Sequence, residues 1–445
     1  ERWQTRPQTI KVKGQADVTY TARSSRHGPV ISDAVPSHAK VLDLQRHVLA
    51  LRWSALEEDN QTVLAGLLGN EARDVDSLFA AFAHHHSPMQ NVVAADVHGR
   101  IGYKAIGRTP LRSLDNDLRG VAPAPGWLAK YDWQGWRAYE DNPQDSGRRG
   151  WIATANQRVE PAGALRPLTA DWSLPYRYQR IADQLQARER HDVRSMQALQ
   201  NDLHSNAMLK LWPHLLNTQA QHPLAGAAMA ELKRFDGTMA ADQAAPLIGA
   251  VWVDELVRGI IAPRIGAARF DAVYGKRDFR AGLEGMLQSD NRWWCGAAGC
   301  QVAATQALER TLTRIAATQG NDVSAWRWGQ AHMARSKHQP FGQVDALARI
   351  FNVTRATGGD TYTVNAGQYN PGDTKTPFVN HQAPSMRAIY DLADLEQSVF
   401  IYQTGKSGLV HSSRYRDMAD EWATGRYRPL QFQPAQWTHR LTLQP

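Results

Sequence analysis

The first third of the chain alternates apolar and polar residues over short runs. Thr9–Lys13 and Asp17–Arg23 change character at every second residue, which is typical of strands with one buried face. The apolar run His47–Trp53 predicts another strand. Asn91–Val97 and Ile101–Gly107 flank a His-Gly turn and predict a β-hairpin. This part of the chain is therefore expected to be rich in strands.

Two helices are predicted within the same third. Ala55–Leu68 carries few breakers, and Val75–His84 places apolar side chains three to four residues apart. The middle of the chain then turns helical. One amphipathic helix is predicted to end at Pro213, and others are predicted over Leu224–Phe235 and Pro246–Ile261. The apolar positions of the first of these are Met196, Leu199, Leu203, Ala207 and Leu211.

From Trp326 onward the pattern returns to strands and loops. Strands are predicted over Thr361–Asn365, Ser385–Asp391 and Ser398–Tyr402, and a short helix over Tyr415–Thr424. Strands, then helices, then strands again favour an α+β fold whose sheet recruits both ends of the chain. No Pro-, Ser- or Gly-rich linker divides residues 1–445, so a single domain is expected.

Charge and composition exclude several classes of function. The net charge is +8, but Arg and Lys stand singly among Asp and Glu and form no basic stripe with interleaved aromatic residues. We therefore expect no nucleic-acid binding. No apolar run reaches the roughly 18 residues needed to cross a bilayer, so no membrane span is expected.

The chain has two cysteines, Cys295 and Cys300, separated by Gly-Ala-Ala-Gly. This spacing allows a small disulfide-closed loop, which would indicate an oxidising compartment. Two reduced, buried thiols are the alternative. No second Cys or His pair stands at zinc-site spacing, so structural zinc is not expected.

Asn156 is the first candidate for chemistry. An apolar strand is predicted over Trp151–Ala155, and it would deliver the Asn156 amide at its exit. A primary amide held at such a place is a preorganised N–H donor that can stabilise a developing oxyanion. The commoner explanation of Asn at a strand end is turn preference, and that alternative stays open on these residues alone.

Several segments in this order resemble the β chain of the penicillin acylase family, which are N-terminal-nucleophile amidohydrolases. They are Gln90–Asp96, Gly99–Tyr103, Pro123–Trp127, Tyr131–Gly135, Arg148–Val159, Tyr176–Ile181 and a C-terminal block from Trp326 to Pro429. The resemblance implies the αββα sandwich of N-terminal-nucleophile hydrolases, with a helical excursion between Asp183 and Asp322. It divides the domain into a β-rich part (1–182), a mostly helical part (183–322) and a part that completes the sheet (323–445).

The resemblance also assigns roles to two residues. Asn156 matches the family's oxyanion-hole amide, in the pattern aromatic-Ile-x-x-x-Asn. Arg180 matches an Arg near the nucleophile that orients the α-amino group and the Asn; as a cation it would lower the pKa of that ammonium. Arg177 is the alternative if the register slips, and an ordinary surface Arg is the alternative without the family.

A structural calcium ion is a further implication of the resemblance. Asp171 aligns with a calcium-ligating Asp, and a carbonyl near Gly120 is its expected partner. An N-cap role explains a lone Asp equally well. Two histidine motifs suggest no metal: His27 is expected to be structural, and the consecutive His84, His85 and His86 would point in different directions on a helix.

The resemblance places the reacting Ser outside this chain. Family members use a Ser at the first β-chain residue, freed by self-cleavage, whereas Glu1 cannot perform that chemistry. We therefore expect the C-terminal part of a β chain, incomplete for catalysis by itself. Its expected partners are an α chain from the same precursor, the N-terminal β segment and a small acyl-amide substrate, in the periplasm or outside the cell. Amide hydrolysis of the penicillin acylase type is expected; an acyl-homoserine-lactone acylase and a catalytically inactive binding protein are the alternatives.

Overall fold

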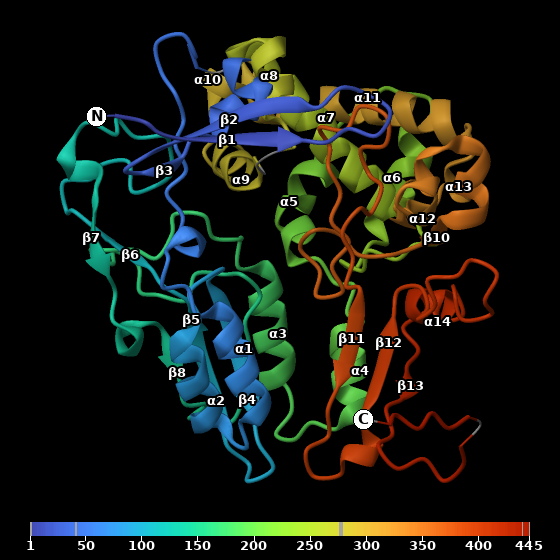
Figure 1. Ribbon diagram of the computed structural model, residues 1–445. Coiled ribbons are helices and arrows are strands. Elements are labelled where there is room, and N and C mark those ends of the chain that lie inside the picture. Colours follow the sequence, from blue (N-terminus) through green and yellow to red (C-terminus); the bar gives the residue numbers. More distant parts are fainter. Residues whose placement is uncertain (1, 41, 276–278, 438, 445) are drawn as a thin grey trace. The chain divides into compact units, whose positions relative to one another are not determined.

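The computed structural model describes residues 2–40, 42–275, 279–437 and 439–444 (Figure 1). Its contacts divide the chain into two compact units, residues 1–173 and residues 174–445. The division falls near the predicted end of the β-rich part, while the expectation of a single domain stays a prediction.

The first unit begins with an antiparallel sheet of β1 (Gln4–Ile10), β2 (Val18–Ser25) and the two-residue β3 (Gly28–Pro29). The strand predicted over Asp17–Arg23 is confirmed as β2 with shifted bounds, whereas the strand predicted over Thr9–Lys13 shares only Thr9 and Ile10 with β1. The strand predicted over His47–Trp53 is wrong. That segment makes only an isolated bridge between Ala50 and Val30, because β3 is too short to offer a longer ladder.

The predicted hairpin is confirmed. β4 (Gln90–Ala95) and β5 (Ile101–Ile106) pair in an antiparallel register, and the short β8 (Gln144–Asp145) extends the sheet. The Asp96 carboxylate accepts the backbone N–H groups of His98 and Arg100, at 2.9 and 3.1 Å, and so fixes the turn. A second small sheet pairs β6 (Pro110–Arg112) with β7 (Trp133–Trp136).

Two helices accompany the hairpin, α1 (Thr62–Glu71) and α2 (Val75–Ala81). The first is shorter than predicted, because Asn60 accepts the backbone N–H of Thr62 and starts the helix there. α2 packs tightly on β5: a Cβ added to Gly102 would lie 2.7 Å from a methyl group of Val75.

The second unit has a helical core built around the long α7. The most deeply buried large side chains include Trp252, Trp326 and Trp328. Its first helices are α3 (Tyr176–Gln186), α4 (Val193–Gln200), α5 (Asn206–Leu216), α6 (Ala225–Lys233), α7 (Ala244–Ile265), α8 (Ala267–Val273), α9 (Arg280–Gln288), α10 (Arg292–Cys295) and α11 (Cys300–Gln319).

The amphipathic helix predicted up to Pro213 is two helices, α4 and α5. The Asn201 amide donates to the carbonyl of Gln197 at the end of α4, and Ser205 caps α5 by accepting the N–H of Met208. Pro213 lies inside α5 rather than after it. The apolar spacing continues across the break, so spacing alone did not reveal it.

The buried carboxylate of Glu284 on α9 joins three helices of this core. It accepts hydrogen bonds from Tyr176 on α3 at 2.6 Å, Lys210 on α5 at 2.7 Å and Arg280 on α9 at 2.7 Å. Burial by itself would raise the pKa of Glu284, but these three donors outweigh it and leave the pKa below its usual value of 4.5.

Strands return after α11, as predicted. β9 (Met333–Ser336) pairs with β10 (Val353–Ala356), and β11 (Met386–Ile389), β12 (Val399–Tyr402) and β13 (Arg428–Pro429) form another sheet. Three helices lie among them: α12 (Trp328–Ala331), α13 (Asp345–Phe351) and α14 (Ala419–Ala423). The strand predicted over Thr361–Asn365 is wrong, because the Asp360 carboxylate binds the N–H groups of Tyr362 and Thr363 and folds the segment into a turn.

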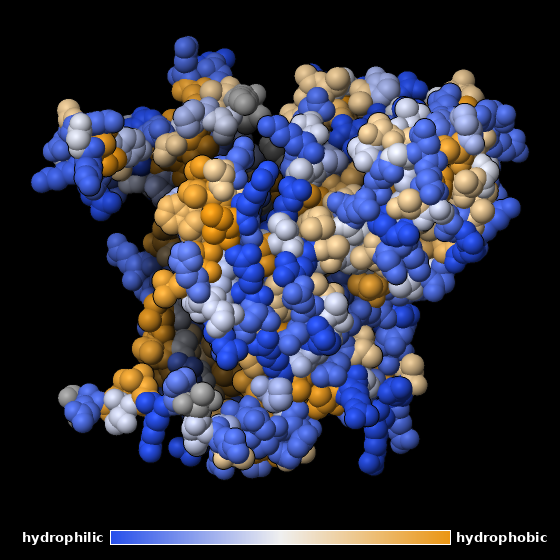
Figure 2. Space-filling model, turned by 90° about the vertical axis from the view of Figure 1, so that its right-hand side faces the viewer, coloured by the Kyte–Doolittle hydropathy of each residue, from blue (hydrophilic) through white to orange (hydrophobic). Residues whose placement is uncertain are grey.

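The surface mixes hydrophilic and hydrophobic residues. On the face drawn in Figure 2, hydrophobic patches lie between hydrophilic side chains. Several large apolar side chains are strongly exposed, among them Val63, Leu67, Trp127 and Leu165. Within the described ranges, no helix combines the length and the apolar content that a membrane crossing requires.

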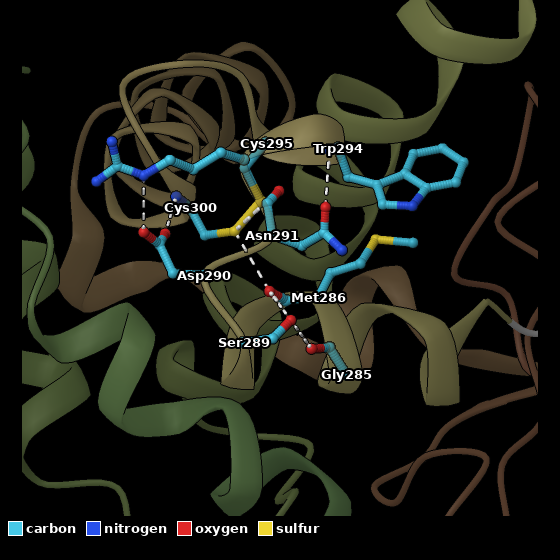
Figure 3. The surroundings of a disulfide bond; sticks show 9 residues. Gly285, Met286, Ser289, Asp290, Asn291, Trp294, Cys295 and Cys300 are labelled. Carbon is cyan, nitrogen blue, oxygen red and sulfur yellow. Dashed lines mark hydrogen bonds and ion pairs between the residues drawn. A yellow bond between two sulfur atoms is a disulfide. The ribbon is translucent and has the colours of Figure 1, made fainter.

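A disulfide joins Cys295 at the end of α10 to Cys300 at the start of α11 (Figure 3). The disulfide-closed loop is therefore confirmed. Asp290 supports the loop: its carboxylate accepts the backbone N–H of Cys300 at 2.7 Å, and Arg292 pairs with the same carboxylate at 3.3 Å. The loop is therefore closed by one covalent bond and anchored by one acidic side chain.

Candidate active site

The segment that delivers Asn156 is not the predicted strand. Residues 151–155 pair with no strand, and a bend follows at residues 155–157. Side chains replace the missing ladder. The amide of Asn91 on β4 donates to the Thr154 hydroxyl at 3.1 Å, and the Ala155 N–H donates to the Gln157 side chain at 2.7 Å. The segment is thus positioned without a sheet.

A short relay ties this segment to the hairpin. The Tyr103 hydroxyl on β5 donates to the Asn91 side-chain oxygen at 2.7 Å, and the Asn91 amide group in turn reaches Thr154. Burial raises the pKa of Tyr103, so its phenol remains a protonated donor at all ordinary pH values. The relay therefore keeps its direction from β5 toward the Asn156 segment.

Asn156 lies at the bend with a left-handed backbone, at a φ of 63°. Asn tolerates this conformation better than other side chains that carry a Cβ, so turn preference does contribute to its place. Its carbonyl accepts the N–H of Ser173 at 3.0 Å, which fixes the peptide, while the residue itself is exposed. A fixed backbone at an exposed residue is compatible with a side-chain N–H donor to a substrate oxygen.

Arg180 lies on α3 and is held by Asp202. Its Nε and Nη2 atoms lie 3.0 and 2.6 Å from one oxygen of that carboxylate. This pairing changes the electrostatic part of the prediction, because Asp202 compensates the charge that was expected to lower the pKa of a nearby ammonium. An orienting role for the guanidinium is unaffected. Arg177, the alternative, is also on α3, and burial lowers its pKa.

Asn156 and Arg180 belong to different units, the first and the second respectively. Their assignment to one oxyanion site stays a prediction.

The two residues expected at a calcium ion both lie in the first unit and are exposed. Gly120 has a left-handed backbone, and the Arg112 guanidinium packs where its Cβ would stand. The backbone N–H of Asp171 donates to the Thr169 hydroxyl at 3.0 Å. Within the described ranges no three His, Cys, Asp or Glu side chains form a cluster suited to a metal. A cation beside Gly120 works against a second one there, so the donor set fits calcium only partly.

The histidines that the sequence singled out have separate surroundings. His27 lies 2.7 Å from the carbonyl of Gly126, and Gly28 approaches the Leu51 carbonyl so closely that no Cβ would fit. His84 contacts Gln61 and His85 the carbonyl of Pro88, each at 2.7 Å, while His86 is buried and burial lowers its pKa. Their side chains have separate partners, as expected, although only His84 belongs to a helical turn and His85 is extended.

Sequence reasoning missed Asn91 and Tyr103 beside the Asn156 segment, and Asp202 beside Arg180. Asn91 did carry a signal, since an amide inside an otherwise apolar strand calls for a partner. Tyr103 and Asp202 carried none, because their partners depend on the folded chain.

The structure resembles a known enzyme fold. It superposes on the thermostable penicillin G acylase from Alcaligenes faecalis with a TM-score of 0.68 at 19% sequence identity, over 100% of this chain and 82% of that one. The likeness confirms the predicted fold class, the α+β fold of N-terminal-nucleophile hydrolases. A sequence model described as penicillin amidase matches residues 1–439. The chain therefore belongs to the penicillin amidase family.

Curated relatives agree with this membership. The acyl-homoserine lactone acylase QuiP of Pseudomonas putida is 30% identical over 474 residues, 99% of this chain and 56% of that protein. QuiP of Pseudomonas aeruginosa is 27% identical over 100% of this chain and 57% of its own length. The penicillin acylase 2 proenzyme of Pseudomonas sp. SE83 is 28% identical over 93% of this chain and 52% of the relative. The chain thus spans just over half the length of these relatives.

Proposed function

We propose that the protein containing this chain is an amidohydrolase that cleaves the amide between an acyl chain and an amine-bearing nucleus. The observation that carries the proposal is the family match over residues 1–439. The exposed position of Asn156 and its fixed, left-handed backbone support it, because this geometry is compatible with an oxyanion donor.

In the proposed mechanism, a Ser outside these 445 residues attacks the carbonyl, and its own α-amine takes the hydroxyl proton. The C–N bond of the tetrahedral intermediate then breaks, and the amine leaves with that proton. Water next attacks the acyl-enzyme ester and releases the acid. Asn156 donates a hydrogen bond to the oxyanion in both halves, and Arg180 orients the amine and the Asn.

Two substrate classes fit the proposal, acyl-homoserine lactones and penicillins. The names of the two QuiP relatives favour acyl-homoserine lactones. The proenzyme relative and the penicillin G acylase fold support a penicillin as the alternative. Both classes carry the same type of amide, so the proposed chemistry does not depend on the choice.

The proposal includes further polypeptide and an exported location. An α chain from the same precursor and the N-terminal β segment would contact this chain. The strongly exposed apolar side chains Val63, Trp127 and Leu165 support such contacts, because large apolar groups gain from being covered. The disulfide supports a location in the periplasm or outside the cell, where such bonds persist. The proenzyme relative supports maturation from a precursor.

Calcium remains part of the proposal in a limited form. Asp171 would supply a carboxylate and Gly120 a carbonyl, while the other oxygens that calcium requires would come from further polypeptide. The ion would be structural, so chelation should lower thermal stability before it lowers turnover. Equal melting temperatures with and without a chelator would rule it out.

The test uses the complete precursor, expressed with export and allowed to mature. Released amine is measured for N-acyl-homoserine lactones with hexanoyl to dodecanoyl chains and for penicillin G. Turnover of either class, lost in the isosteric Asn156→Asp variant, supports the proposal. Binding of these amides without turnover by the matured wild type would instead indicate a catalytically inactive binding protein.

A further inference from the structure

A cleft of about 420 Å³ lies entirely within the second unit and away from Asn156 and Arg180 in sequence. Its walls come from α7, α11, α12, β9 and the loop of residues 374–379. Volumes of about 300–1,000 Å³ are typical of sites for small organic molecules. The proposed amide hydrolysis assigns this cleft no task.

The floor of the cleft is apolar and firmly held. Leu247 and Val251 of α7, Ile315 of α11 and Phe378 of the loop are all buried, and all four belong to the main hydrophobic core. A floor that is part of the core keeps its shape when a ligand enters or leaves. It would favour a ligand with a hydrocarbon portion.

The mouth of the cleft is cationic. Arg314, Arg335 and Lys375 line it, and none of the residues lining it is acidic. Arg314 is already paired with Asp254 and Glu255, at 2.6 and 2.8 Å. Arg335 and Lys375 are exposed, and within the described ranges their side chains have no ion pair or hydrogen bond.

The carboxylate nearest in sequence does not compensate these two cations. Asp373 accepts the Thr376 hydroxyl at 2.7 Å and the backbone N–H groups of Lys375 and Thr376. These bonds lower the pKa of Asp373 and hold its oxygens toward its own loop. The cleft therefore offers an anion two uncommitted cations above a hydrocarbon floor.

We propose that this cleft binds a small organic carboxylate with an aliphatic or aryl tail. The planar guanidinium of Arg335 matches the geometry of a carboxylate, and Lys375 adds a mobile positive charge. The tail lies on the floor formed by the four core residues. This binding involves no chemical step and is independent of amide hydrolysis.

Octanoate is the probe, titrated calorimetrically into the complete, matured protein. Acetate supplies the head without the tail, octanol the tail without the head, and inorganic phosphate a charge without either. We expect octanoate to bind at least ten-fold more tightly than each of the three. Phosphate binding as tight as octanoate would overturn the proposal, because it would show a site that recognises charge alone.

The double variant Arg335→Gln, Lys375→Gln locates the binding. Both side chains are exposed, so the fold should tolerate the change. We expect octanoate to bind at least ten-fold more weakly at this site, and the matched exposed-cation control Arg349→Gln to leave it unchanged. Octanoate can also enter the proposed catalytic site as a product acid; loss of one of two binding events in the double variant still supports the cleft. Unchanged octanoate binding in the double variant, or no binding by the wild type, overturns it.

Discussion

Asn156 offers a test that separates its amide from its backbone. Its φ of 63° lies in the left-handed region, which costs a residue with a Cβ about 1–2 kcal/mol and is free of that strain for Gly. Asn156→Ala would therefore combine the loss of the donor with backbone strain. Asn156→Gly removes the same donor without backbone strain. Comparing the Ala and Gly variants therefore separates the loss of the donor from the strain.

The expected magnitudes follow from this geometry. Loss of one oxyanion donor costs about 2.7–4 kcal/mol of transition-state stabilisation, which is about 10²–10³-fold in kcat, and it should appear equally in the Gly and Ala variants. Only Ala should lose stability as well, by about 1 kcal/mol, which corresponds to only about 1 °C in melting temperature for a chain of 445 residues. KM should change little, since the oxyanion forms only in the transition state.

The assay is steady-state release of amine by the complete enzyme, with thermal melts of the same preparations. Near wild-type kcat in Asn156→Gly would refute the oxyanion role. Activity lost in Ala but kept in Gly would mean that the bend at residues 155–157 matters and the amide does not.

Three further predictions concern other parts of the chain. Thiol labelling of denatured, unreduced protein should find neither Cys295 nor Cys300 free, and two labelled cysteines would contradict the disulfide. In the complete enzyme, Arg180→Ala should lower kcat. Asp202→Asn should leave the Arg180 charge uncompensated, which lowers the pKa of the nucleophile's ammonium and moves the acidic limb of the pH–rate profile to lower pH. An unmoved limb would argue against proximity of Arg180 and the ammonium. Because the pKa of Glu284 is lower in the folded protein, its stabilisation is complete above about pH 4.5 and is lost as the pH falls through the folded value. Denaturant unfolding should show that Glu284→Gln costs about 3 kcal/mol at pH 7. The cost should become smaller as the pH falls below about 4.5, and a cost that does not change with pH would contradict this origin.

Local pattern predicted the elements whose partners are close in sequence. The β4–β5 hairpin followed from alternation around a His-Gly turn, and α6 and α7 from apolar spacing. Residues 151–155 form no strand: the Ala155 N–H donates to the Gln157 side chain, and Thr154 is held through its own hydroxyl by Asn91, 63 residues away. A periodic pattern says which face is buried, but it does not say which group satisfies the backbone.

The candidate site was predicted to a similar extent. The resemblance singled out Asn156 and Arg180 from short motifs, and family membership is now shown. The partners of these residues could not be predicted from the sequence. Asp202, for example, pairs with Arg180 only because the chain turns between α4 and α5. Whether a carboxylate compensates a cation depends on tertiary structure. A sequence motif that contains an Arg therefore does not reveal how strongly that Arg shifts the pKa of a neighbouring group.

The shared carboxylate of Glu284 also constrains how this chain can be redesigned. Tyr176, Lys210 and Arg280 all donate to it, so substitutions at these four positions affect one another and are not independent. A single substitution leaves the remaining polar groups without a partner, and the loss is most costly for the buried Arg280. A joint replacement by apolar residues of similar volume avoids that penalty. Libraries that vary this core should therefore change the four codons together.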